Sequence, residues 1–176
     1  MRGWTVRSLV AALAAVPMIA AGCGMRTCVE DEKAVISKIV KDSICWALTK
    51  DRRTADATMA HDPDLFYFWV DWNDTVSGWE QHSKLMDLFM DPKFKATRTE
   101  VRDLRVTLSR SGDVAWYSAL LDDVAEWDGR QVGATDIRWT GVLEKRGGTW
   151  VIVQMHASLA ADKVREKAAA KSAAGI

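Results

Sequence analysis

The stretch RWTGVLEKRGGTWVIVQMHAS, residues 138–158, carries the clearest structural signal in the chain. Two runs that alternate apolar and polar side chains flank a glycine pair, a pattern typical of a β-hairpin with one buried face. A three-residue loop at 146–148 would place Trp139 opposite Met155 and Arg138 opposite His156. We therefore expect His156 on the outer face, in a polar network or a dimer contact; ligand contact at a strand end and catalysis are the alternatives.

Further turn signals extend this hairpin into an antiparallel meander. The expected strands cover residues 97–108, 114–126, 131–145 and 149–159. With Asp128 and Gly129 as a hairpin tip, the same parity argument pairs Ser118 with Trp139. The face expected to turn toward the helices then holds Leu104, Val106, Leu108, Val114, Trp116, Ser118, Leu120, Asp122, Trp139, Gly141, Val153 and Met155.

Helical periodicity dominates the first half of the chain. Apolar residues recur at i, i+3 and i+4 between Glu30 and Lys50, which predicts a long amphipathic helix. A shorter helix over 52–61 and an aromatic strand over 65–70 follow. Ser77 and Glu80 have the spacing of a capping box that would start a third helix. Helices followed by a bent antiparallel sheet are the element order of an α+β fold.

Residues 1–22 have the layout of an export signal, because Arg2 and Arg7 precede an apolar run. The segment IAAGC at 19–23 resembles the lipobox of bacterial lipoproteins, in which the cysteine is lipidated. We therefore expect a lipoprotein-type signal peptide at 1–22 and lipidation of Cys23. The mature protein would be exported and anchored to a membrane, facing the periplasm or the cell exterior. Cleavage by an ordinary signal peptidase, with Cys23 unmodified, is the alternative.

The composition argues against several classes of protein. Basic and acidic residues number 24 each and are mixed along the chain, so we expect no nucleic-acid partner. The scattered cysteines and histidines match no zinc pattern, and we expect neither a metal nor a cofactor. A disulfide between Cys28 and Cys45 stays open. Export favours it, but on one continuous helix the two cysteines would lie about 25 Å apart.

Between Glu30 and Leu159 the chain resembles the SnoaL-like branch of the nuclear transport factor 2-like superfamily. The resemblance rests on the early helix pair, on Gly78-Trp79-Glu80, on SGDVAWYSA at 111–119 and on the hairpin at 138–158. It implies an α+β, cystatin-like fold, a cone-shaped barrel of a strongly bent antiparallel sheet packed on three N-terminal helices. The expected domain covers 23–160, followed by a flexible or helical tail at 161–176.

Members of this superfamily commonly dimerise through the outer face of the sheet, which implies a homodimer here. The residues expected on that face are Tyr117, Leu121, Trp150 and Ile152, beside Arg138, Gln154 and His156.

The concave face of such a cone would form a pocket for a small apolar ligand. The candidate pocket residues are Tyr67, Trp69, Trp79, Trp116, Ser118, Asp122, Trp139 and Met155. For the three aromatic residues of the helix side, plain core packing is the alternative, and Asp122 could equally belong to a salt-bridged rim with Arg98, Glu100 and Arg102. We expect a ligand-binding or interaction domain without assigned catalysis. The alternative is a small isomerase, dehydratase or lyase acting on a hydrophobic carbonyl compound, with Asp122 as base and Tyr67 or His61 as donor.

Overall fold

A computed structural model describes residues 21–70 and 75–173. Most of the expected signal peptide lies outside these ranges. The helices and strands, in chain order, are α1 (Ala21–Thr49), α2 (Arg52–Ala57), β1 (Phe66–Phe68), β2 (Val76–Ser77), α3 (Gly78–Phe89), β3 (Phe94–Leu108), β4 (Val114–Trp127), β5 (Arg130–Arg146), β6 (Thr149–Ser158) and α4 (Ala161–Ala173).

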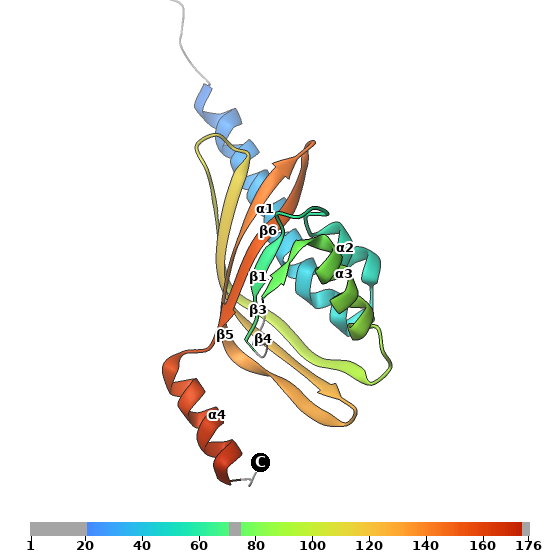
Figure 1. The fold of residues 1–176 in the computed structure, drawn as a ribbon. Coiled ribbons are helices and arrows are strands. Elements are labelled where there is room, and N and C mark those ends of the chain that lie inside the picture. The colour runs from blue at the N-terminus through green and yellow to red at the C-terminus, as the bar shows by residue number, and fades with distance from the viewer. Residues whose placement is uncertain (1–20, 71–74, 174–176) are drawn as a thin grey trace, which may run out of the picture.

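The strands form one curved, open sheet in the order β2-β1-β6-β5-β4-β3 (Figure 1). The α+β class is thereby confirmed. The pairs β3–β4, β4–β5 and β5–β6 are antiparallel, as expected for a meander. One further pair is parallel: β1, whose partner was not predicted, pairs with β6. This pairing brings the helical half of the chain onto the last strand.

The core lies between the helices and the concave face of the sheet. Ile36 and Val40 of α1 are fully buried there, as are Leu121 of β4 and Leu143 of β5. Burial of one such side chain contributes about 1.5 to 3 kcal/mol. Alternation along the strands therefore fixes which residues face the helices.

The β5–β6 turn has two residues, not the predicted three. Gly147 and Gly148 have φ values of 57° and 86°, which a tight hairpin turn requires and glycine adopts without strain. Arg146 consequently pairs with Thr149. The predicted register was wrong at this end of the hairpin.

A bulge at Val153 then compensates for the shorter turn. The register passes from Ile152 directly to Gln154, so that Met155 pairs with Gly141 and His156 with Thr140. His156 is exposed, and its predicted place on the outer face is confirmed. Its predicted partner Arg138 lies opposite Ser158 instead. Between the turn and the bulge, the side chains of β6 point to the faces opposite to those predicted. Trp150 and Ile152 are therefore buried in the core and do not form part of the outer face.

A second bulge shifts the register between β4 and β5. Asp123 pairs with Ala134 and Leu121 with Ile137, which leaves two residues of β5 opposite one residue of β4. Trp139 therefore pairs with Ala119, not with Ser118.

Because of this one-residue shift, the β4 side chains predicted to face the helices point to the outer face, and those predicted on the outer face point to the helices. Tyr117 and Leu121, expected in a dimer contact, are buried beneath the helices. Trp116, expected in the pocket, is 48% exposed on the outer face, and Ser118 is exposed beside it. The predicted face of these residues was wrong.

Two predictions about the helices also need correction. α1 begins nine residues before Glu30, and it carries both Cys28 and Cys45, which are free thiols. At the start of α3 the Ser77 side chain caps no helix amide. Gln81 accepts a hydrogen bond from the Ser77 amide instead, at 2.8 Å, in the place expected for Glu80.

Candidate ligand cavity

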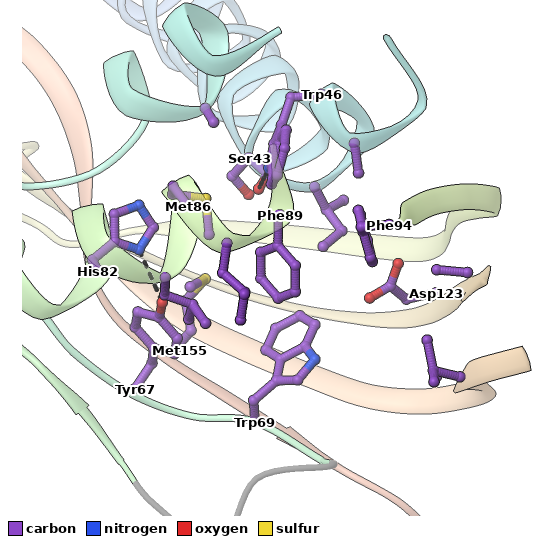
Figure 2. A pocket seen from close by; sticks show the side chains of 18 of the residues that line it. Ser43, Trp46, Tyr67, Trp69, His82, Met86, Phe89, Phe94, Asp123 and Met155 are labelled. Carbon is purple, nitrogen blue, oxygen red and sulfur yellow. Dashed lines mark hydrogen bonds between the residues drawn. The ribbon is translucent and has the colours of Figure 1, made fainter. Parts of the chain in front are cut away.

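A cavity of about 530 Å³ lies between the helices and the concave face of the sheet (Figure 2). α1, α3, β4 and β5 supply most of its wall. Leu88 and Val132 line it and are 50% and 39% exposed, so the cavity opens to solvent between α3 and the β4–β5 hairpin. Its size is typical of sites for small molecules.

Four of the eight predicted pocket residues line this cavity: Tyr67, Trp69, Trp139 and Met155. The parallel pairing of β1 with β6 places Tyr67 beside Met155. Trp79 is not part of the wall. Its ring stacks on the His61 ring at a centroid distance of 3.7 Å and packs against the core, as the alternative interpretation expected.

Trp116, Ser118 and Asp122 lie outside the cavity, because the extra residue on β5 shifts the register of the β4–β5 pair from the predicted one. Asp122 is 2% exposed but is covered from the outer side. Its carboxylate accepts hydrogen bonds from Arg102 at 2.8 Å and from the Asp136 amide at 2.9 Å, and it pairs with Arg98 at 2.7 Å. These contacts support the alternative interpretation, in which Asp122 belongs to a salt-bridged cluster with Arg98 and Arg102.

Burial alone would raise the pKa of the Asp122 carboxyl. The hydrogen bond from the Asp136 amide and the guanidinium groups of Arg102 and Arg98 outweigh burial, so this pKa lies below its ordinary value. A carboxylate held ionised by two arginines on the wrong face cannot serve as a base in the cavity.

The carboxylate that lines the cavity is Asp123, the next residue along β4. Figure 2 shows it pointing into the same space as Phe89, Phe94 and Trp69. Gly133 on β5 makes this wall possible. Its φ is +87°, and a Cβ at this position would lie 2.0 Å from the Asp123 carbonyl oxygen.

A hydrogen-bonded pair occupies the other side of the cavity. Tyr67 Oη and His82 Nδ1 are 2.9 Å apart, and both side chains are buried (Figure 2). Burial lowers the pKa of His82 to about 4 and raises the pKa of Tyr67, so both groups are neutral at physiological pH.

Sequence reasoning missed His82, although Trp79, His82 and Met86 share the helical spacing of a buried stripe. It also missed the α1 contribution of Trp46 and Ser43, which face the cavity (Figure 2).

Most of the wall is aromatic or aliphatic. Trp139 Nε1 and His82 Nε2 are buried and have no hydrogen-bond partner within the described ranges. An unpaired buried polar group costs about 1 to 3 kcal/mol, which a ligand or water atom would recover. No lysine or arginine of the described chain lines the cavity.

No three His, Cys, Asp or Glu side chains gather into a possible metal site in the part of the chain that the structure describes. Among the described helices, none is long and apolar enough to cross a membrane.

Comparison with known families agrees with this architecture. The profile of the SnoaL-like domain family matches residues 36–162. The chain belongs to this family. No curated protein is significantly similar to it.

Solved structures with the same fold include a nuclear transport factor 2-like protein with a cystatin-like fold from Novosphingobium aromaticivorans. It is 14% identical, with a TM-score of 0.64, over 86% of this chain and 97% of that protein. A proposed dehydratase of the same superfamily from Streptomyces avermitilis is 16% identical, with a TM-score of 0.63 and coverage of 75% and 98%. A proposed ketosteroid isomerase from Parabacteroides distasonis is 19% identical, with a TM-score of 0.51 and coverage of 72% and 86%. At these identities the likeness establishes the fold alone.

Proposed function

We propose that this chain is an exported, lipid-anchored SnoaL-like domain that binds a small, largely apolar molecule in its cavity. The observation that carries the proposal is a space of about 530 Å³ walled by aromatic and aliphatic side chains, with a few polar groups among them. Such a composition favours binding by shape and burial, with the polar groups fixing orientation.

Binding can be tested with N-phenyl-1-naphthylamine, a neutral apolar fluorophore. We expect saturable enhancement of its emission with a stoichiometry of one per chain. Ala47→Met would project into the cavity and reduce the affinity, whereas Leu48→Met, at the next and exposed position of α1, would leave it unchanged. Equal effects of the two variants, or no saturable signal, would contradict the proposal. Mass spectrometry of protein purified from its native host would then identify a co-purified ligand.

A second candidate function is acid–base catalysis on a hydrophobic carbonyl compound, as in an isomerase, dehydratase or lyase. It is favoured by one observation, the Asp123 carboxylate and the Tyr67–His82 pair lining one apolar space. Asp123 would remove a proton, and the opposing pair would donate to the developing oxyanion. If a substrate of this class is turned over, Asp123→Asn should reduce the rate about 100-fold and leave probe binding intact. Turnover that survives this substitution would exclude the mechanism.

Lipidation of Cys23 would hold the cavity away from the membrane surface. Cys23 and Ser43, which lines the cavity, lie on one helix, and their spacing in the sequence corresponds to about 30 Å along its axis. Intact-mass analysis of membrane-fraction protein should show an N-terminus at Cys23 that carries acyl chains. Cys23→Ala should release the protein or leave it unprocessed. An unacylated mature chain that begins elsewhere would refute the anchor.

Self-association through the outer face is the remaining part of the proposal. One row across this face runs from Phe66 through Gln154 and Val142 to Trp116, each residue paired with the next. Phe68 lies in the adjacent row, is 45% exposed and contacts the His156 ring edge-on at 5.8 Å. Exposed aromatic residues on a self-complementary sheet face favour a two-fold dimer.

A further inference from the structure

We propose that a ligand enters and leaves the cavity by movement of a flap, formed by the distal ends of β3, β4 and β5, which Arg102 holds closed from the outer face of the sheet. The flap comprises residues 94–97 and 123–134. This inference rests on the proposed binding function, and it concerns the route by which a ligand passes between solvent and the cavity.

The flap supplies the part of the cavity wall that reaches solvent. Its lining residues include Phe94, Ala125, Trp127, Gln131, Val132 and Gly133. Val132 is 39% exposed at the opening, and Leu88 of α3, also a lining residue, is 50% exposed. Movement of the flap away from α3 would therefore widen the opening through which a ligand must pass.

The flap packs on the helices through an apolar cluster that is separate from the main core. Phe94 and Ala125 are buried in this smaller cluster together with Trp46, Ala47 and Met86. The side chains of the main core form a different cluster, and residues of both clusters line the cavity. Movement of the flap would separate the smaller cluster alone, and the main core would keep its packing.

Two β-bulges lie where the flap joins the rest of the sheet. One falls at Thr97, which the register between β3 and β4 passes over. The other places two residues of β5 opposite Asp122 of β4. Bulges bend a strand and interrupt its ladder of hydrogen bonds. In Figure 1 the distal ends of the three strands turn sharply away from the upper part of the sheet. The bulges therefore mark the level at which the flap can hinge.

Arg102 connects the three strands on the outer face of this hinge. Its Nη2 atom donates hydrogen bonds to Asp122 Oδ1 at 2.8 Å and to Asp136 Oδ1 at 2.7 Å. Arg98, next to the flap, pairs with the other carboxylate oxygen of Asp122 at 2.7 Å. Asp136 is a residue of the β5 bulge and has a φ of 57°, which is unfavourable for most side chains. These charged contacts hold the bulge, and with it the bend, in one arrangement.

The test compares the loss of Arg102 with the loss of Arg146, at the opposite end of β5. Arg146 pairs with Asp62 and Glu144, and its side chain is 30% exposed, against 33% for Arg102. Neither arginine lines the cavity as the structure describes it. Both Arg102→Gln and Arg146→Gln remove an arginine from an ion-pair cluster. Only Arg102→Gln should speed the dissociation of N-phenyl-1-naphthylamine, by about fivefold, because only this substitution frees the flap.

Stopped-flow dilution of the probe complex measures this rate. Arg102→Lys should restore slow dissociation, because a single nitrogen atom makes both carboxylate contacts. Arg98→Gln removes a more exposed member of the cluster and should accelerate dissociation less. If Arg102→Gln does not fold, the comparison of Arg98→Gln with Arg146→Gln decides the question in the same way.

The outcomes separate the two proposals. Dissociation from Arg102→Gln at the rate of the unmodified protein would overturn the flap mechanism and leave the binding site standing. Equal acceleration by Arg102→Gln and Arg146→Gln would also overturn it, since dissociation would then follow the general loss of stability. Absence of saturable probe binding by the unmodified protein would instead overturn the binding function itself.

Discussion

Asp122 and Asp123 are neighbours on β4 and lie in opposite surroundings. Asp122 points to the outer face, where two arginines and a backbone amide engage its carboxylate. Asp123 lines the cavity among aromatic rings. Successive side chains of a strand point to opposite faces, and the extra residue on β5 sets the register in which Asp123, not Asp122, turns toward the cavity.

The same kind of side chain thus acquires its chemistry from the face of the sheet that it occupies. On the outer face, arginine contacts keep the carboxylate ionised and make it a structural group, with its pKa below the ordinary value. On the cavity face, the carboxylate of Asp123 shares the wall with aromatic and aliphatic side chains. A register error of one residue would therefore exchange a structural residue for a candidate ligand-binding one.

The largest expected effect is on the strand contact that supports Asp123. Gly133→Ala should lower the free energy of unfolding by about 3 kcal/mol, because a left-handed φ is strained for alanine and the new Cβ would collide with the Asp123 carbonyl. Gly129→Ala is the matched control, with φ +77° and open space around its Cβ; it should cost about 1 kcal/mol. Urea titrations of both variants measure the difference. Similar costs would mean that β5 does not approach Asp123 closely.

His82 on the cavity side and Asp122 on the outer side should each make the free energy of unfolding depend on pH, over different pH ranges. The folded-state pKa of His82, about 4, lies below its unfolded value of about 6.5, so the unfolded chain binds the proton first. Stability should fall by up to about 3 kcal/mol as the pH drops from about 6.5 to 4. The Asp122 pKa is also lowered, and its contribution is present above about 4 and is lost as the pH falls further.

Denaturant titrations over a pH series measure both windows. His82→Gln should remove the slope between pH 6.5 and 4 and leave the loss at lower pH. A slope that survives this substitution would show that another group titrates there.

Asp122→Asn should cost about 2 kcal/mol of unfolding free energy. It removes the charge that Arg98 and Arg102 share, but both arginines reach solvent and recover part of their hydration, so the loss stays below that of a fully buried pair. Asp123→Asn should cost less than half as much, since it leaves the arginine cluster intact. Thermal or urea unfolding of the two variants compares them directly. Equal losses of unfolding free energy in Asp122→Asn and Asp123→Asn would show that the arginine contacts do not make Asp122 the more stabilising carboxylate.

Much of the fold could be predicted from the sequence, because it depends on periodicity and turn residues. Alternation identified the four long strands, and the Asp128-Gly129 tip pairs Trp127 with Arg130 as the parity argument requires. The outer position of His156 was also predicted, although two errors cancelled: a turn one residue too long and an overlooked bulge at Val153.

The site could be predicted only in part. Beyond a bulge, counting alternate residues no longer tells which face a side chain occupies relative to the neighbouring strand. Nothing in the residues around Asp122 marks the extra residue on β5, where Asp136 adopts a φ of +57° that the sequence does not specify. Tyr67 and Met155 line the cavity as predicted; Met155 kept its predicted face because the shorter turn and the bulge at Val153 offset each other. His82 was overlooked because a histidine within an amphipathic helix is consistent with either the polar or the buried face.

The smallest expected effect on folding belongs to the exposed aromatics of the outer face. Phe68→Ser and Trp116→Ser should each change the stability of the monomer by no more than about 0.5 kcal/mol, because each side chain is nearly half exposed. The same changes should shift a dimer toward monomer, since they remove apolar area that only a second copy would cover.

Leu48→Ser is the matched control, a residue of equal exposure on α1. Sedimentation at tens of micromolar, roughly the range in which an interface of standard size persists, measures the shift. A strictly monomeric unmodified protein would end the dimer proposal, and a dimer weakened equally by Leu48→Ser would place its interface elsewhere than on the sheet.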